Sequence, residues 1–201
     1  MSELTDLYQT IAQCQRCDLA KGRKLTVPGE GPETAALVFV GEAPGYHENQ
    51  QGRPFVGAAG HFLEELLASI GMKRDQVYIA NVIKCRPPGN RDPLNDELEA
   101  CRPYLIQQLD LIDPRLIVTL GRFSMAYFLG NVSISRIHGQ PQQKDGRIVF
   151  PMFHPAAALH QPKYRSAIEQ DFLKIPGLLA QAKTMATTEP PSPPPQQLSL
   201  F

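Results

Sequence analysis

Four cysteines are the residues of this chain whose type and spacing point most directly to chemistry. Cys14 and Cys17 form a Cys-x2-Cys pair, and Cys85 and Cys101 follow much later in the chain. Two sulfurs at that spacing can reach one metal centre, and four cysteines suit tetrahedral zinc as well as a 4Fe-4S cluster. The spacing by itself leaves zinc, a cluster and ordinary buried thiols open.

Two glycine-rich segments form a second group of candidate residues. Gly41–Gly45 (GEAPG) and Gly52–Gly57 (GRPFVG) allow the backbone to turn tightly and to approach a ligand with its N–H groups. Phe55 in the second segment could stack on a flat base. Taken separately, each segment is equally typical of a simple turn, and Phe55 of a core residue.

Asn81 and His154 extend this group to a recognisable combination. The Asn81 amide offers a donor and an acceptor side by side, which matches the O4 and N3–H edge of a pyrimidine. The His154 imidazole can donate to an oxygen that becomes negative as a base leaves. With Phe55, these side chains predict an enzyme that acts on a base flipped out of nucleic acid.

The elements that must position these residues alternate between strand and helix. Short runs rich in Val and Ile predict strands at 36–41, 77–83, 115–121 and 147–152. Helical spacing predicts helices at 4–13, 61–70, 96–112, 122–129 and 163–183. This order predicts a three-layer α/β/α sandwich with a central, mainly parallel four-stranded sheet.

In such a sheet the working residues gather in loops beyond the carboxyl ends of the strands. The loops to consider are therefore 41–57, 84–91 and 153–162. On this prediction Cys85 ends a strand and Cys101 lies inside a helix, so each thiol sits on a rigid element.

Composition predicts one globular domain over residues 1–183 and a proline-rich tail over 184–201. The formal net charge is zero, so a nucleic-acid-binding face would have to be local. Basic residues beside the candidate loops could form one: Lys21, Arg23, Lys24, Lys84, Arg86, Arg91, Lys163 and Arg165. We expect a cytoplasmic, nucleoid-associated monomer without membrane contact, because neither a leader nor an apolar span is evident.

In order along the chain, these motifs resemble those of the family-4 uracil-DNA glycosylases. The resemblance spans about residues 10–180 and is carried by Cys14-x2-Cys17, GEAPG, GRPFVG, the 81–88 run NVIKCRPP and His154-Pro155-Ala156. It implies a uracil-DNA glycosylase-like fold. It also implies an enzyme that flips uracil from single- or double-stranded DNA and hydrolyses the N-glycosidic bond. The abasic site left behind begins base excision repair, and no lyase activity is expected.

The resemblance also assigns the cysteines and three side chains of the site. It implies a mainly structural 4Fe-4S cluster on Cys14, Cys17, Cys85 and Cys101. Phe55 would stack on uracil, Asn81 would read its edge, and His154 would stabilise the uracil anion.

Further roles implied by the resemblance belong to the loops. The backbone of Gly41, Glu42 and Ala43 would line the uracil pocket, and the Glu42 carboxylate would act on water and the sugar cation. Asn90 would hold the attacking water, and Glu48 would lie near C5 of the base, where a thymine methyl would clash.

Two other classes of protein compete with this interpretation. A cluster-bearing nucleic-acid-binding module would not need Phe55, Asn81 and His154 together. An electron-transfer protein would be expected to carry a flavin or nicotinamide fingerprint, and none is evident. In the 156–160 loop, Leu159 is the apolar candidate for the wedge that fills the gap left by the flipped base.

The end of the chain resembles a different recognition motif. Gln197-Leu198-Ser199-Leu200-Phe201 is similar to the QL[SD]LF peptide by which bacterial DNA-repair and replication proteins bind the β sliding clamp. A partner groove would bury the three apolar side chains, while Gln197 supplies a directional hydrogen bond. Residues 190–195, with five prolines, would act as a semi-rigid spacer.

Overall fold

A mainly parallel sheet forms the centre of the computed structural model, which describes residues 2–186. Its strands are β1 (Leu37–Gly41), β2 (Tyr78–Asn81), β3 (Leu116–Leu120), β4 (Gln142–Lys144) and β5 (Arg147–Met152). They lie in the order β2-β1-β3-β5-β4. The pairs β1–β2, β1–β3 and β3–β5 are parallel, and β4 is antiparallel to β5 at one edge.

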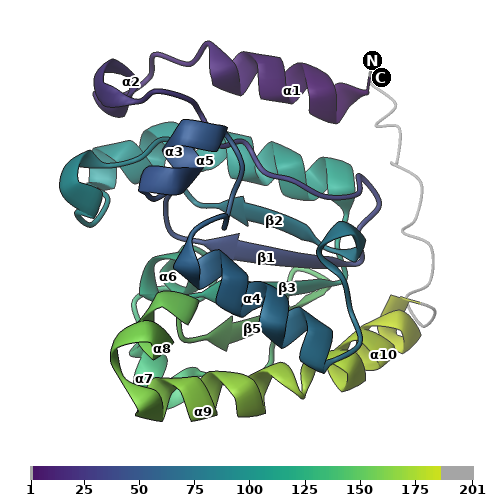
Figure 1. Cartoon of the computed structure of the whole chain (residues 1–201). Coiled ribbons are helices and arrows are strands. Elements are labelled where there is room, and N and C mark those ends of the chain that lie inside the picture. The colour runs from purple at the N-terminus through teal and green to yellow at the C-terminus, as the bar shows by residue number, and fades with distance from the viewer. Residues whose placement is uncertain (1, 187–201) are drawn as a thin grey trace, which may run out of the picture.

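Helices cover both faces of this sheet, and Figure 1 shows α4 in front of the strands and α1 stacked above α5. The helices are α1 (Glu3–Ala12), α2 (Leu19–Gly22), α3 (Tyr46–Gln51), α4 (Ala58–Ser69), α5 (Asn95–Ile112), α6 (Arg122–Leu129), α7 (Ile134–Ile137), α8 (Pro155–His160), α9 (Pro162–Phe172) and α10 (Ile175–Ala186). Two 3-10 turns, η1 (Arg74–Gln76) and η2 (Pro88–Asn90), complete the described elements.

The strands are apolar on both faces because each face meets a helical layer. Leu37 and Phe39 of β1 join a core with α4, α9 and α10, in which the Phe39 and Phe172 rings stack at 5.6 Å. Val38 and Val40 point the other way and pack with α1 and α5. Alternation along a strand therefore serves two cores, which explains the nearly continuous apolar runs.

The predicted α/β/α sandwich is confirmed, with one strand more than the four expected. The additional strand, β4, is polar and exposed, so it has no apolar run to signal it. A turn through Asp145 and Gly146, both at positive φ, joins it to β5. An Asp-Gly pair between two short segments is typical of a β-hairpin, so Asp145-Gly146 is the sequence signal that indicates this strand.

Two boundaries also differ from the predictions. The helix expected over 163–183 is two helices, α9 and α10, because Pro176 near the start of α10 lacks the N–H that a continuous helix needs there. Cys85 does not end a strand: β2 stops at Asn81, and Cys85 lies in the irregular segment that follows. The last helix runs on to Ala186, and residues 187–201, with the terminal pentapeptide, lie outside the described residues.

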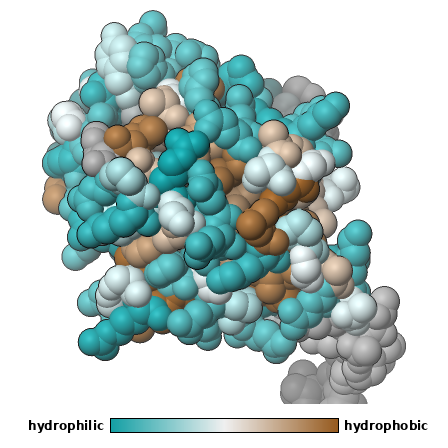
Figure 2. Space-filling model, turned by 60° about the horizontal axis from the view of Figure 1, so that its bottom comes forward, coloured by the Kyte–Doolittle hydropathy of each residue, from teal (hydrophilic) through white to brown (hydrophobic). Residues whose placement is uncertain are grey.

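One face of the molecule is mostly polar. Figure 2 shows the side of α8, α9 and α10 as largely hydrophilic, with hydrophobic side chains in small separate patches. Among residues 2–186, every helix is too short or too polar to cross a membrane.

Candidate active site

A cleft of about 630 Å³ opens at the edge of the sheet where the parallel strands end. It receives the segments that follow β1, β2 and β5, as expected for an open parallel sheet. Most of the side chains predicted for the site line this one cleft: Glu42, Ala43, Glu48, Phe55, Asn81, Asn90 and His154. Segments from distant parts of the sequence therefore meet where the prediction requires.

Gly41 lies against two of these residues and must be glycine. It pairs with Asn81 across β1 and β2. An added Cβ at Gly41 would lie 2.4 Å from Asn81 Oδ1 and 2.8 Å from the Phe55 ring. The missing side chain thus lets the amide and the ring pack side by side over the strand end.

Asn81 presents an unused acceptor at the cleft. Its side chain is buried, and its Oδ1 atom has no hydrogen-bond partner among the described residues. A buried acceptor without a partner costs free energy, roughly 1 to 3 kcal/mol. A ligand N–H placed in the cleft would remove that cost.

Phe55 lies in the wall of the cleft with its ring buried, and its backbone conformation is unusual. Its φ of 51° lies in the left-handed region. The ring stacks on His154, with centroids 5.6 Å apart and planes 26° from parallel. Glu48 holds the following residues, because its Oε1 atom accepts from the N–H groups of Val56 at 2.8 Å and Gly57 at 2.9 Å.

His154 caps the first turn of α8 with its imidazole. Nδ1 accepts from the Ala156 N–H at 3.1 Å. Burial lowers the pKa of His154 to about 4, with the Glu48 charge acting in the opposite direction. The ring is therefore neutral at pH 7 and, since Nδ1 is an acceptor, its proton is on Nε2. The site thus contains a neutral N–H donor.

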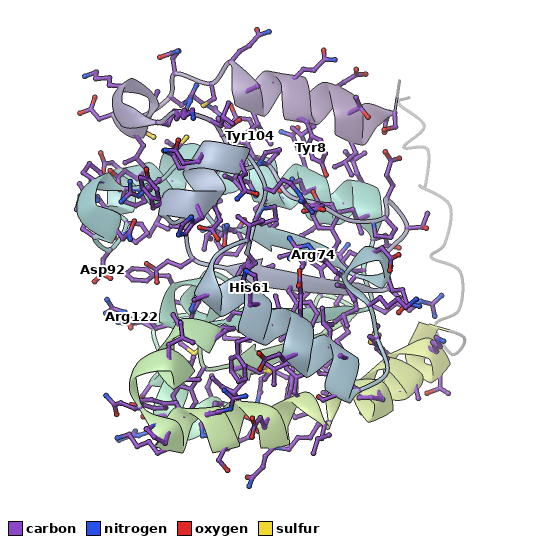
Figure 3. The ribbon with its side chains drawn as sticks, in the orientation of Figure 1. Tyr8, His61, Arg74, Asp92, Tyr104 and Arg122 are labelled. Atoms are coloured by element: carbon purple, nitrogen blue, oxygen red, sulfur yellow. The ribbon has the colours of Figure 1, made fainter. Side chains whose placement is uncertain are left out.

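Glu42 is a carboxyl of the cleft whose pKa is shifted. Its pKa is raised to about 7, mainly by burial and further by the Asp92 charge, while Arg122 acts in the opposite direction. Asp92 and Arg122 form an ion pair and lie together at one edge of the molecule in Figure 3. Glu42 can therefore exchange a proton near neutral pH.

Asn90 sits at the rim of the cleft, at the end of η2, with a φ of 56°. Its Oδ1 atom accepts from Arg86 Nε at 2.7 Å. The Arg86 guanidinium lies 5.2 Å from the centre of the Tyr46 ring. Arg86, which the sequence suggested only as part of a basic face, thus orients Asn90 and is itself placed over the Tyr46 ring.

The four cysteines line one small cavity between α1, α2, α5 and the segment after β2. Burial raises the pKa of Cys101 to about 11, and it raises those of Cys17 and Cys85 as well. Thiolates here need a positive partner, such as bound metal. Two hydrogen bonds reach these sulfurs. The Lys84 backbone N–H donates to Cys101 Sγ at 3.2 Å, and the Arg23 guanidinium donates to Cys85 Sγ at 3.5 Å.

The donor set of this cavity is what a metal centre would need. Four cysteine sulfurs line it, and four thiolates are the ligands of structural zinc and of a 4Fe-4S cluster alike. Within residues 2–186, no three His, Cys, Asp or Glu side chains are close enough together to bind a single ion.

Lys84 is not part of the basic face considered above, because the fold buries it. Its side chain is 1% exposed and donates to the Asn81 carbonyl at 2.8 Å and to Gln108 Oε1 at 2.6 Å. Arg91 and Arg165 are also engaged, with Glu97 and with Glu65 and Glu169. Lys84 therefore links the cysteine segment to the strand end that carries Asn81.

Comparison with known proteins places the fold and this cleft in one class. The family model for the uracil DNA glycosylase superfamily matches residues 28–174. That range includes both glycine-rich segments, Asn81 and His154.

Individual relatives show which branch of this superfamily the chain resembles. Type-4 uracil-DNA glycosylases of Archaeoglobus fulgidus and Sulfurisphaera tokodaii are 49% and 47% identical over 185 residues, covering 87% of this chain and 92% and 84% of theirs. The type-4 enzyme of Thermotoga maritima is 44% identical over 75% of this chain and 80% of its own. The chain therefore belongs to the uracil-DNA glycosylase superfamily and, within it, to the type-4 enzymes.

Proposed function

We propose that this protein is a uracil-DNA glycosylase that removes uracil from DNA by hydrolysis and leaves an abasic site. The observation that carries the proposal is the convergence of Phe55, Asn81 and His154 on one cleft. A stacking ring, an unpaired amide acceptor and a neutral N–H donor are the groups that a flipped uracil requires. The relatives named above support the same activity.

Binding of the base follows from these groups. Uracil lies on the Phe55 ring, its N3–H donates to Asn81 Oδ1, and the Asn81 amide N–H donates to O4. Cytosine reverses the pattern at these two positions and is rejected. Glu48, fixed by its two backbone donors, stands beside the base and excludes a 5-methyl group.

Cleavage then proceeds through a cation-like sugar. The bond between N1 and C1′ breaks, its electron pair leaves with uracil, and negative charge develops on O2. His154 Nε2–H donates to that oxygen, and water oriented by Asn90 attacks C1′. The Glu42 carboxylate stabilises the cation and takes the proton of the water. These fixed groups act without reorganisation at the moment of reaction.

The cysteine cavity completes the proposal. We assign Cys14, Cys17, Cys85 and Cys101 as ligands of a 4Fe-4S cluster. Bound there, the cluster would join the N-terminal segment to the core without taking part in the hydrolysis. Leu159, 47% exposed on α8, is the proposed wedge.

The terminal pentapeptide 197–201 is assigned to a partner. We propose that it binds a bacterial β sliding clamp and that the proline-rich segment before it keeps the catalytic domain near DNA. A cytoplasmic, nucleoid-associated monomer is the corresponding setting.

A release assay tests the activity. A single-stranded oligonucleotide with one uracil should yield free uracil and an alkali-labile site, whereas matched thymine and cytosine oligonucleotides should remain intact. Binding of the uracil strand without release would favour a nucleic-acid-binding module. Strand cleavage without alkali would contradict a purely hydrolytic enzyme.

A further inference from the structure

A partly buried arginine outside the cleft holds the backbone that carries Phe55. Arg74 belongs to η1, and its side chain is only 15% exposed. Nη1 donates to the Phe55 carbonyl at 3.0 Å, and Nη2 donates to the Pro54 carbonyl. In Figure 3 Arg74 points from η1 across the front of the strands toward the segment that leads into α4. One guanidinium thus serves two successive carbonyls of an irregular segment.

The same segment is held from the opposite side. The Phe55 carbonyl and the Val56 N–H belong to one planar peptide and point in opposite directions. Arg74 binds the carbonyl end, and Glu48 binds the N–H end at 2.8 Å. This pair of contacts fixes the orientation of the peptide that follows Phe55, and with it the direction of the ring.

Arg74 is itself tied to the sheet. Glu30 Oε2 accepts from Arg74 Nη2 at 3.1 Å, and Glu30 also binds Arg53. The Glu30 backbone pairs with Ile79 of β2 through two hydrogen bonds, of 2.9 and 2.8 Å. Burial raises the pKa of Glu30, but its bonds to Arg53 and Arg74 outweigh this and lower it overall. A charged carboxylate therefore anchors Arg74 to a rigid strand.

The backbone of Phe55 needs such support. A φ of 51° is rarely adopted by a residue with a side chain, and it persists where the surroundings enforce it. α4 contributes as well, because an added Cβ at Gly60 would lie 2.0 Å from the Phe55 carbonyl oxygen. Without Arg74, two carbonyls lose their donor and the strained conformation loses one of its restraints.

We propose that Arg74 is a positioning residue of this glycosylase, which sets the Phe55 ring for stacking on the flipped base. The proposal rests on the stacking role of Phe55 proposed above. Arg74 does not line the cleft and touches no reacting atom. Its effect reaches the base only through the Pro54 and Phe55 carbonyls.

A double-mutant cycle tests the proposal on the full chain. Arg74→Ala, Arg74→Lys, Phe55→Ala and the Phe55→Ala/Arg74→Ala double variant are compared for kcat, KM, inhibition by free uracil and melting temperature. We expect Arg74→Ala to lower kcat/KM by about tenfold and to weaken inhibition by free uracil by a similar factor, as partial loss of stacking would. Arg74→Lys keeps the charge but loses the forked contact, so its kcat/KM and its inhibition by uracil should lie between those of the parent and those of Arg74→Ala.

The coupling between the Phe55 and Arg74 substitutions separates a positioning role of Arg74 from a purely stabilising one. In the Phe55→Ala background, Arg74→Ala should have little further effect on uracil inhibition, because the ring that it orients is gone. Arg53→Ala is the matched control, because it removes the other partner of Glu30. The Arg53 side chain is 54% exposed and binds Glu30 rather than the Pro54 or Phe55 carbonyls. Its uracil inhibition should stay within about twofold of the parent.

The alternative outcomes are distinguishable. If Phe55→Ala leaves excision and uracil inhibition unchanged, the stacking role itself is wrong. If Phe55→Ala is impaired but Arg74→Ala costs the same factor in both backgrounds, only the positioning role is overturned. Failure of both Arg74 variants to fold would assign Arg74 to stability and would also overturn it.

Discussion

The Ala156 N–H donates to His154 Nδ1 at 3.1 Å, and this bond decides which imidazole nitrogen carries the proton. With Nδ1 as acceptor in a neutral ring, the proton is on Nε2, which on the proposed mechanism would donate to the leaving base. His154→Ala should lower kcat on the order of 100- to 1000-fold with DNA affinity roughly kept, because the donor strengthens its bond as charge develops. Single-turnover rates and equilibrium binding measure the two effects. Equal losses in both would make His154 a positioning residue.

The same imidazole predicts how stability depends on pH. Its pKa is about 4 in the folded protein, below the ordinary 6.5. Between these values the unfolded chain takes up a proton that the folded protein does not, so the free energy of unfolding falls as pH drops from 6.5 toward 4. Urea unfolding of the parent and of His154→Gln across this range measures the difference. An equally steep slope in His154→Gln would refute the assignment.

Glu42 should control the acidic limb of the pH profile of kcat for uracil excision. With a pKa of about 7 and a role as carboxylate, it should make kcat rise as pH increases through 7. Asp92→Asn removes a like charge and should move the limb to lower pH, whereas Arg122→Gln should move it higher. Glu42→Gln should abolish the limb. A limb that stays at the same pH in all three variants would exclude Glu42.

Asn81→Asp should change base selection. A carboxylate can accept but not donate, so the bond to uracil O4 is lost, while the N4 donor of cytosine gains an acceptor. We expect uracil excision to fall by about tenfold or more and cytosine excision to rise relative to it. Matched uracil and cytosine oligonucleotides provide the measurement. Unchanged uracil excision would remove Asn81 from base recognition.

The cysteine cavity predicts a brown protein whose iron and sulfide are lost together. Replacement of Cys85 or Cys101 by Ser should lower the melting temperature before it affects the chemistry, since as cluster ligands they would join the N-terminal segment to the core. Metal analysis of anaerobically purified protein is the check. Stoichiometric zinc with little iron would contradict the cluster.

Deletion of residues 197–201 should abolish binding to a bacterial β sliding clamp and leave excision on short oligonucleotides intact. Short substrates do not require a clamp, so they serve as the internal control. Replacing Leu200 and Phe201 by Ala tests the same apolar contacts in a full-length chain. Clamp binding that persists in the truncated protein would refute the motif.

The sequence by itself predicted four of the five strands and the residues that meet at the candidate site. Apolar runs revealed the four buried strands, because a strand covered on both faces is apolar throughout. Phe55, Asn81 and His154 could be named in advance from the chemistry of their side chains and from the motifs that contain them. The alternation of strands and helices predicted that their segments meet at one edge of the sheet. The strand β4 was not predicted, because an exposed strand needs no apolar run in its sequence.

Only the tertiary structure decided how these residues are held. Arg74 reaches Phe55 from 19 residues away, and Gln108 reaches Lys84 from 24. No local pattern encodes such contacts, because they depend on which irregular segments the packed sheet brings together. Lys84 shows the consequence: its sequence neighbours predict an exposed cation, but the fold buries it between the cysteine cavity and Asn81. Burial and orientation are properties of the assembled layers, so they could not be read from spacing alone.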